Sequence, residues 1–342
     1  MQARHLYAGG ALLLSTAFAN LAAAQETPRP AILADLAVAT TLVDITHAGE
    51  RLVAVGQRGH ILHSADGRIW KQAVSPHNAM LNRVRFRNER MGWAVGHDNT
   101  IAATTDGGDS WSLQHFDPEG RGLNDIIILR SGKLIAVGGY GAYLESDDDG
   151  ASWIAGENNL SELGYHLNAG LELKDGSIMV VGERSLMGRS LDQGASWVVI
   201  VSPYEGSLFG MLPMGESGVL AYGMRGNVYI SDDISATRSM DPLDFDPFAK
   251  QTVEDPEELN KMGWRQIPAV TIESLFGGTW RGNTALLVGV NGTAVQVDPE
   301  AGRMQLVETP ADETLGDAIW ANDQWIAVGR RGVQPLGPLV WN

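Results

Sequence analysis

The chain has 342 residues, of which 44% are hydrophobic and 19% charged, and its formal net charge is −16 at pH 7. This is the composition of an ordinary globular protein, and the excess of acidic residues argues against nucleic acid as a partner. The absence of cysteine excludes disulfides, thiolate nucleophiles, Cys-ligated metal sites and a lipidated N-terminal cysteine. The 41 glycines against 14 prolines favour a turn-rich all-β chain.

The first 24 residues have the pattern of a secretory signal peptide. Arg4 gives a basic start, an apolar stretch runs to about Leu21, and residues 22–24 are alanines. The pattern predicts cleavage after Ala24 and, in a bacterium, a periplasmic protein. A membrane anchor is the weaker interpretation because small and polar residues dilute the apolar run. No later stretch approaches the ~20 apolar residues that span a bilayer, so we expect no direct membrane insertion.

A PAILADLAV segment follows the signal at residues 30–38. Spacing within the later repeats places an outermost strand at this point, although no repeat precedes it. The last repeat ends after its third strand, near GPLVWN. The sequence therefore predicts that the N-terminal strand completes the last blade of a closed ring and removes its exposed edges. An open solenoid is the alternative.

A repeat with a period of 40 to 44 residues fills residues 25–342, interrupted once by a longer spacing of 66. Each copy has a strand that ends in a marker glycine, namely Gly56, Gly96, Gly138, Gly182, Gly223, Gly289 and Gly329. A leucine precedes each glycine by 14 or 15 residues, namely Leu42, Leu81, Leu123, Leu167, Leu208, Leu275 and Leu315. A unit of this size with about four short strands is one propeller blade. The fold class predicted is an all-β, seven-bladed β-propeller.

An acidic turn closed by tryptophan ends the third strand of the early repeats. The pattern S/T-x-D-x-G-x-x-W occurs in full at Thr104–Trp111, Ser146–Trp153 and Ser190–Trp197, and one residue shorter at Ser64–Trp70. The Asp carboxylate can accept hydrogen bonds from its own turn, glycine supplies positive φ, and the indole packs under the hairpin. Catalysis by these aspartates is disfavoured because they recur around a rim instead of converging on one point.

These tandem Asp-box (BNR) hairpins, preceded by a V-G-x-x-G turn and repeated seven times, resemble the photosystem II stability and assembly factor family. The resemblance covers about residues 31–342. It implies a seven-bladed propeller of the thylakoid lumen or periplasm, and a non-catalytic scaffold that binds a membrane-protein segment or an envelope complex. We expect a monomer. The acidity and the missing lipid-anchor cysteine favour a member from a non-photosynthetic bacterium.

A partner-binding face is predicted around the channel mouth. In a propeller, the turn between the second and third strands and the loop into the innermost strand lie on this face. Arginine pairs bidentately with carboxylates. The candidate partner-binding residues are Arg58, Arg83, Arg85, His97, Tyr140, Arg184, Arg225, Arg330 and Arg331. The alternative is that each arginine pairs with an acidic neighbour such as Asp44, Asp125 or Asp317.

An insertion at residues 234–263 explains the long spacing. Residues 255–262 predict a short helix with Pro256 at its first position. The spacing of Asp241, Asp244 and Asp246 fails the EF-hand pattern, and the histidines show no metal-binding spacing. We therefore predict neither a metal nor a cofactor. The hydrophobic residues of the insertion, Leu243, Phe245 and Phe248, are expected to dock on the adjacent blade or on a partner.

A sialidase-like glycan-binding protein or glycoside hydrolase is the alternative function, since sialidases also carry Asp-boxes. That chemistry needs three arginines, a Tyr/Glu pair, an acid Asp and usually an R-I-P motif. The nearest match to the motif is the weak one at residues 29–31, and none of the seven tyrosines has an evident glutamate partner. There is no G-x-S-x-G elbow, P-loop or dinucleotide fingerprint. We predict that the protein is not an enzyme.

Overall fold

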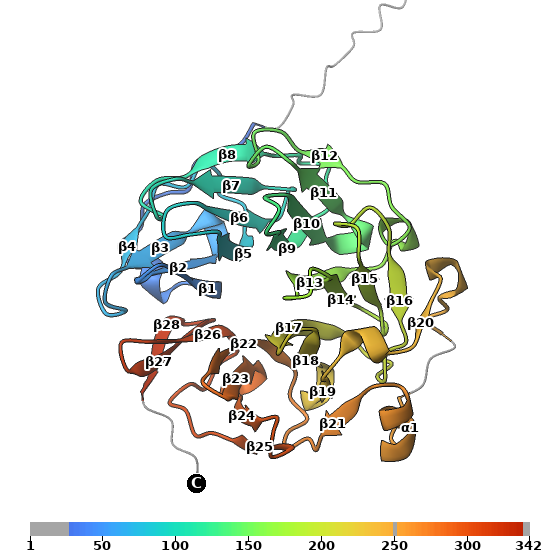
Figure 1. Ribbon diagram of the computed structural model, residues 1–342. Helices are drawn as coiled ribbons and strands as arrows, with labels where there is room; N and C mark the ends of the chain where they lie inside the picture. The colour runs from blue at the N-terminus through green and yellow to red at the C-terminus, as the bar shows by residue number, and fades with distance from the viewer. Residues whose placement is uncertain (1–26, 249–251, 338–342) are drawn as a thin grey trace, which may run out of the picture.

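Seven antiparallel sheets surround a central channel in the computed structural model, which describes residues 27–248 and 252–337 (Figure 1). The prediction of an all-β, seven-bladed propeller is confirmed. The signal peptide predicted at residues 1–24 lies outside the described residues. No helix in the described ranges is long and apolar enough to cross a membrane.

The strands of each blade follow the chain outward from the channel. Blade 1 contains β1 (Leu42–Ala48), β2 (Arg51–Gly56), β3 (Ile61–Ser64) and β4 (Lys71–Gln72). Blade 2 contains β5 (Leu81–Phe86), β6 (Gly92–Gly96), β7 (Ile101–Thr104) and β8 (Ser112–His115). Blade 3 contains β9 (Leu123–Ile128), β10 (Leu134–Gly138), β11 (Tyr143–Ser146) and β12 (Ile154–Ala155). Blade 4 contains β13 (Leu167–Glu172), β14 (Ile178–Gly182), β15 (Met187–Ser190), β16 (Val198–Ile200) and β20 (Ser239–Met240). Blade 5 contains β17 (Leu208–Met214), β18 (Gly218–Gly223), β19 (Val228–Ser231) and β21 (Arg265–Ile267). Blade 6 contains β22 (Leu275–Arg281), β23 (Thr284–Gly289), β24 (Ala294–Asp298) and β25 (Arg303–Leu306). Blade 7 contains β26 (Leu315–Ala321), β27 (Gln324–Gly329) and β28 (Gly332–Gly337).

Close backbone contact explains why the leucine and glycine markers recur in phase. In each blade the leucine that opens the innermost strand pairs with the glycine that ends the second strand, as Leu123 does with Gly138. A Cβ atom on any of the seven glycines would lie 1.9 to 2.3 Å from the carbonyl oxygen of the residue before that leucine. Only glycine fits this crossing, so the spacing is a steric requirement of the blade.

Seven hydrophobic clusters fill the seven interfaces between neighbouring blades. Between blades 2 and 3, for example, Trp93 and Val95 pack with Leu134 and Ala136. Each sheet therefore buries both faces, which the blade pattern requires. The core of the protein is a ring of interfaces around the channel.

Three asparagines tie successive blades together at the residue after the marker leucine. The Nδ2 atoms of Asn82, Asn124 and Asn168 donate to the carbonyl oxygens of Leu123, Leu167 and Leu208 at 2.8, 3.0 and 2.8 Å. Each bond joins a blade to the marker leucine of the next blade. The same position in blades 5 and 6 holds Phe209 and Phe276, whose ring centroids lie 5.2 Å apart.

Removal of one of these asparagines should weaken a single blade junction. Asn124→Ala leaves the carbonyl of buried Leu167 without its side-chain donor, and we expect a loss of about 1–3 kcal/mol of unfolding free energy. Chemical denaturation measures this loss. Asn283→Ala, in the exposed turn between β22 and β23, is the control and should change stability by no more than ~0.5 kcal/mol. Equal effects of the two variants would contradict the role of these asparagines in joining neighbouring blades.

The prediction that the N-terminal strand completes blade 7 is wrong. Among the described residues that sheet has three strands in the order β26-β27-β28. Residues 31–34 of the N-terminal segment lie along blade 1, where Ala31 N donates to Ser75 O at 3.1 Å, while Ala37 packs with Val333 of β28 in blade 7 without strand pairing. The side chain of Gln72 also bonds Ala34 N and Ile32 O.

Two features of the segment explain this placement. Ala31 N and Ala34 N donate to Ser75 O and to the side chain of Gln72 in blade 1, and Ala37–Ala39 form a single 3₁₀ turn in place of a strand. Closure does not need such pairing, because Leu42 and Ile45 of blade 1 pack directly against Ile326 of blade 7. Figure 1 shows these two blades side by side. Of the terminal GPLVWN segment, residues 338–342 lie outside the described residues.

The insertion of blade 5 reaches across to blade 4. Its strand β20 pairs with β16 and makes the sheet of blade 4 five-stranded. The predicted helix is confirmed as α1 (Pro256–Lys261), with Asp255 capping its N-terminus. Phe245 is buried between blades 3 and 4, which confirms docking on an adjacent blade for this residue. Leu243 and Phe248 remain 87% and 77% exposed.

Candidate partner-binding site

The turns between the second and third strands project from one face around the channel, which we call the mouth face. The second residue after the marker glycine has a left-handed backbone in six of these turns, at Arg58 (φ 57°), Asp98 (φ 56°), Tyr140 (φ 52°), Arg184 (φ 52°), Arg225 (φ 57°) and Asn291 (φ 53°). All of these residues except Asp98 are exposed. Because the left-handed conformation recurs in six blades, it is a property of the turn itself.

Three of the predicted arginines on this face are free of ionic partners. Within the described ranges, Arg58, Arg184 and Arg225 have no carboxylate within 4.0 Å. The Arg184 guanidinium lies 5.0 Å from the ring centroid of Phe248, a cation–π contact that leaves its outer donors available. These guanidinium groups are therefore ready to receive an external carboxylate.

Arg330 and Arg331 also lie exposed on the mouth face, but each has an acidic neighbour. Arg330 lies 3.4 Å from Glu313, and Arg331 lies 2.8 Å from Asp312. Exposed pairs of this kind are weak, so they reduce the positive charge in this part of the face without locking the arginines.

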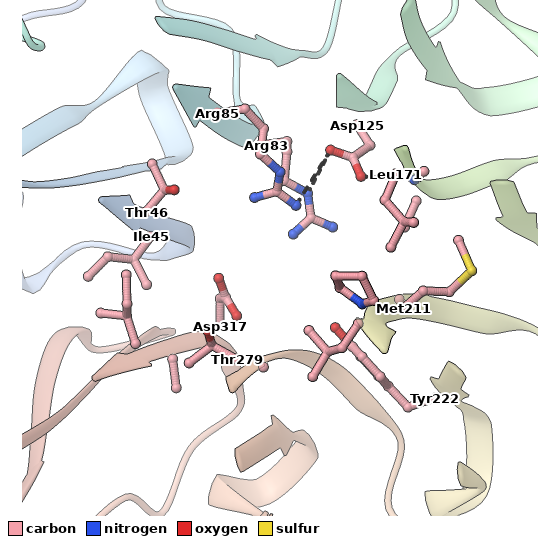
Figure 2. A pocket seen from close by; sticks show the side chains of 18 of the residues that line it. Ile45, Thr46, Arg83, Arg85, Asp125, Leu171, Met211, Tyr222, Thr279 and Asp317 are labelled. Atoms are coloured by element: carbon pink, nitrogen blue, oxygen red, sulfur yellow. Dashed lines mark hydrogen bonds and ion pairs between the residues drawn. The ribbon is translucent and has the colours of Figure 1, made fainter. Parts of the chain in front are cut away.

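Arg83 and Arg85 are paired inside the channel, unlike the arginines of the mouth turns. Both come from β5 and point into the channel (Figure 2), where Arg83 lies 2.9 Å from Asp44 and 3.3 Å from Asp125. Arg85 lies 3.5 and 3.7 Å from the same carboxylates. Burial acts to lower the pKa of Arg83, but Asp125 and Asp44 outweigh it and raise the pKa above its ordinary value. For these two residues the alternative of internal pairing holds.

A groove of about 450 Å³ on the mouth face brings His97 and Tyr140 together. Two residues that the sequence analysis did not select complete it. The ring of His166 lies 4.5 Å from that of Tyr140, and the Arg121 guanidinium lies 5.7 Å from the Tyr140 ring and donates to its carbonyl. Arg121 lies two residues before Leu123, and His166 lies one residue before Leu167, where innermost strands begin. Their short distance from the marker leucines is a signal in the sequence by which both could have been selected.

The opposite face carries the acidic turns, and their carboxylates hold the turns themselves. Asp106 accepts the backbone N–H of Ser110 at 3.0 Å and its hydroxyl at 2.6 Å, and Thr104 donates to the same carboxylate at 2.8 Å. The turns at Asp148 and Asp192 repeat this arrangement. The hydrogen bonds confirm that these aspartates shape the loops.

The acidic turns should lower the stability of the folded protein at acidic pH. Although burial acts to raise it, the hydrogen bonds from Ser110 bring the pKa of Asp106 to about 2. A lowered pKa stabilises the folded state above the unfolded value of about 4, and this contribution is lost as the pH falls through about 2. Thermal midpoints of wild type and Asp106→Asn should therefore differ most above about pH 5 and converge toward pH 2. A difference that does not change with pH would contradict this assignment.

Two other groups of residues that the sequence singles out form local hydrogen bonds. No group of three or more His, Cys, Asp or Glu side chains could hold a metal ion in the part of the chain that the structure describes. Asp241 and Asp246 accept the backbone N–H groups of Leu243 and Phe248. The weak R-I-P match at residues 29–31 lies beside the loop after β4 on the outside of blade 1, where Ala31 is bonded to Ser75.

The comparisons with known proteins agree with the geometry at the level of fold. No family model and no curated protein matches the chain. Among solved structures, YCF48 bound to a D1 peptide is 18% identical with a TM-score of 0.64, and the match covers 92% of this chain and 96% of that one. YCF48 from Cyanidioschyzon merolae is 13% identical with a TM-score of 0.60, covering 86% and 95%. The WD40 propeller domain of Doa1 is 12% identical with a TM-score of 0.63, covering 90% and 96%. The chain is similar to these propellers in fold.

Proposed function

We propose that this protein is a non-catalytic, exported scaffold whose mouth face binds an acidic or C-terminal segment of a partner protein. The observation that carries the proposal is the set of three exposed, left-handed and ionically unpaired arginines, Arg58, Arg184 and Arg225. They occupy the same turn position in blades 1, 4 and 5. A single segment crossing the mouth can contact more than one of them.

Charge supports an acidic segment as the partner. Guanidinium groups pair bidentately with carboxylates, and each charge-assisted pair contributes about 1.5–3 kcal/mol. The chain as a whole is strongly acidic, with a net charge of −16, and repels such a segment over most of its surface. The three arginines around the channel supply a local positive charge that attracts it.

The structural likeness adds support of a different kind. YCF48, which has a similar propeller, is bound to a D1 peptide, so a propeller of this shape can hold a peptide. Together with the family resemblance, this favours a membrane-protein segment or an assembling envelope complex as the partner. The signal pattern of residues 1–24 supports an encounter outside the cytoplasm, in the periplasm of a bacterium.

Charge reversal on the mouth face tests the proposal. Arg58→Glu, Arg184→Glu and Arg225→Glu in one variant should abolish capture of the partner from the native envelope, as measured by affinity purification. The thermal midpoint should stay close to that of wild type because no ion pair is lost. Added salt should weaken wild-type capture, since exposed charges are screened beyond ~8–10 Å.

The matched control reverses three exposed cations away from the mouth turns, Arg68, Lys71 and Lys174. We expect this control variant to retain the partner. Full capture by the mouth variant at low salt would contradict the proposal and move the site elsewhere, with exposed Leu243 and Phe248 of the insertion as the next position to test.

A further inference from the structure

At one level of the channel, the innermost strands of the seven blades carry side chains of very different size and charge. This level is the second residue after the marker leucine, where a bulge in each innermost strand turns the side chain inward. Four consecutive blades place charged residues there, Asp317, Asp44, Arg83 and Asp125. The other three place small ones, Ala169, Gly210 and Gly277. A cavity of about 350 Å³ inside the channel is lined by charged residues from this level together with Ala169 and Gly210 (Figure 2).

The three carboxylates of the cluster are not equally paired. Asp44 is fully engaged, because Arg83 lies 2.9 Å from one oxygen and Val84 N donates to the other at 2.7 Å. Asp125 likewise faces Arg83 at 3.3 Å and accepts the N–H of Gly170 at 3.0 Å. Arg83 and Arg85 pair with these two carboxylates, which leaves a third carboxyl group without a cation of its own.

The third carboxylate belongs to Asp317, which is 7% exposed and lines the cavity. Its carboxyl group has the N–H of Ala318 as a hydrogen-bond donor, but it forms no ion pair within the described residues. Burial and the negative charge of Asp44 raise its pKa well above the ordinary value, while Arg83 and Arg85 oppose this only in part. Among the described residues, the carboxyl group of Asp317 therefore has no cation as an ion-pair partner.

A second buried polar group enters the cavity from blade 5. Tyr222 is 4% exposed, and its hydroxyl occupies the space over Gly210, where an added Cβ would lie 2.3 Å from the oxygen. This hydroxyl has no hydrogen-bond partner among the described side chains and backbone groups, although buried hydroxyls normally have one. Figure 2 shows Asp317 and Tyr222 directed into the cavity from the side opposite Arg83 and Arg85.

We propose that this channel cavity binds a primary ammonium group on a short apolar stem. Asp317 would pair with the ammonium, and the Tyr222 hydroxyl would accept one of its hydrogens. Ile45, Leu171 and Met211 line the same cavity and would pack against the methylene stem. The shared chemistry fits a free alkyl amine or the lysine side chain of a segment that enters the channel. The site does not depend on the mouth arginines, so either proposal can fail alone.

Titration of the wild-type protein with small probes tests the site. Isothermal titration calorimetry at about pH 8, where a lysine-type amine is protonated, should show saturable one-to-one binding of 1,5-diaminopentane or of N-acetyl-lysine methylamide. Binding of the diamine assigns the site to free amines, and binding of the lysine derivative alone assigns it to a partner's side chain. Neutral 1-pentanol and anionic pentanoate should not bind. Absence of binding by both amines, or binding of pentanoate in their place, would overturn the proposal without any mutant.

Substitution then assigns the residues. Asp317→Asn should weaken amine binding at least about tenfold, because it removes the carboxylate that would pair with the ammonium group. Tyr222→Phe should weaken it about threefold through the lost hydrogen bond. Asp323→Asn, in the exposed turn between β26 and β27, is the matched control and should bind as wild type does. Unchanged affinity in a folded Asp317→Asn protein would overturn the assignment.

Discussion

Replacement of Arg83 by methionine is expected to lower the unfolding free energy by about 3–5 kcal/mol. Arg83 carries a side chain that is only 13% exposed and joins Asp44 of blade 1 to Asp125 of blade 3. The variant leaves two buried carboxylates with the more distant Arg85 as their nearest cation. Removing one partner of a buried ionic group is strongly destabilising because the remaining charges stay desolvated. Chemical denaturation at neutral pH measures the loss.

Arg85→Met is the control from the same strand. Its side chain is 34% exposed, and its contacts with Asp44 and Asp125 are longer, at 3.5 and 3.7 Å. We expect a loss of no more than ~1 kcal/mol. A difference of less than 1 kcal/mol between the two variants would show that Arg83 is not the centre of the cluster.

Gly138→Ala is the second substitution with a large expected effect. The new Cβ would lie 2.1 Å from Gly122 O and 2.7 Å from the Cα of Leu123. Both obstacles are backbone atoms, so the innermost strand of blade 3 must move, and we expect a loss of at least about 3 kcal/mol. The neighbouring Gly139→Ala is the control, because its Cβ would meet nothing closer than 3.7 Å.

Thermal unfolding of these two alanine variants separates a steric effect from a general effect of glycine replacement. Gly139→Ala should change stability by no more than ~1 kcal/mol in either direction. If both variants were equally unstable, flexibility of the turn would explain the conserved spacing within the chain better than the backbone crossing does.

The repeat could be predicted from sequence because its markers are local and steric. Leu123 and Gly138 belong to one hairpin, and the same crossing recurs in every blade. Ring closure was predicted wrongly because spacing alone does not show which acceptors the donors of a segment will meet. Ala31 N and Ala34 N bond blade 1, and side-chain packing of Ile45 against Ile326 closes the ring without a shared strand.

The candidate site was only partly predictable for a different reason. Arg58 and Arg83 look alike in sequence, yet one is exposed and the other is buried. The difference depends on the bulge that turns the side chain of Arg83 into the channel, and on carboxylates that neighbouring blades bring to it from about 40 residues away. Asp44 and Asp125 become its partners only when the ring is assembled.

Photocrosslinking in the native envelope tests the central claim most directly. A photoreactive amino acid at Tyr140 lies on the mouth face, and one at Leu191 lies on the acidic turns of the opposite face; the two positions are 60% and 75% exposed. Our account predicts that the probe at position 140 captures a partner protein and that the probe at position 191 captures none above background. Capture at position 191 with none at position 140 would contradict binding at the mouth face.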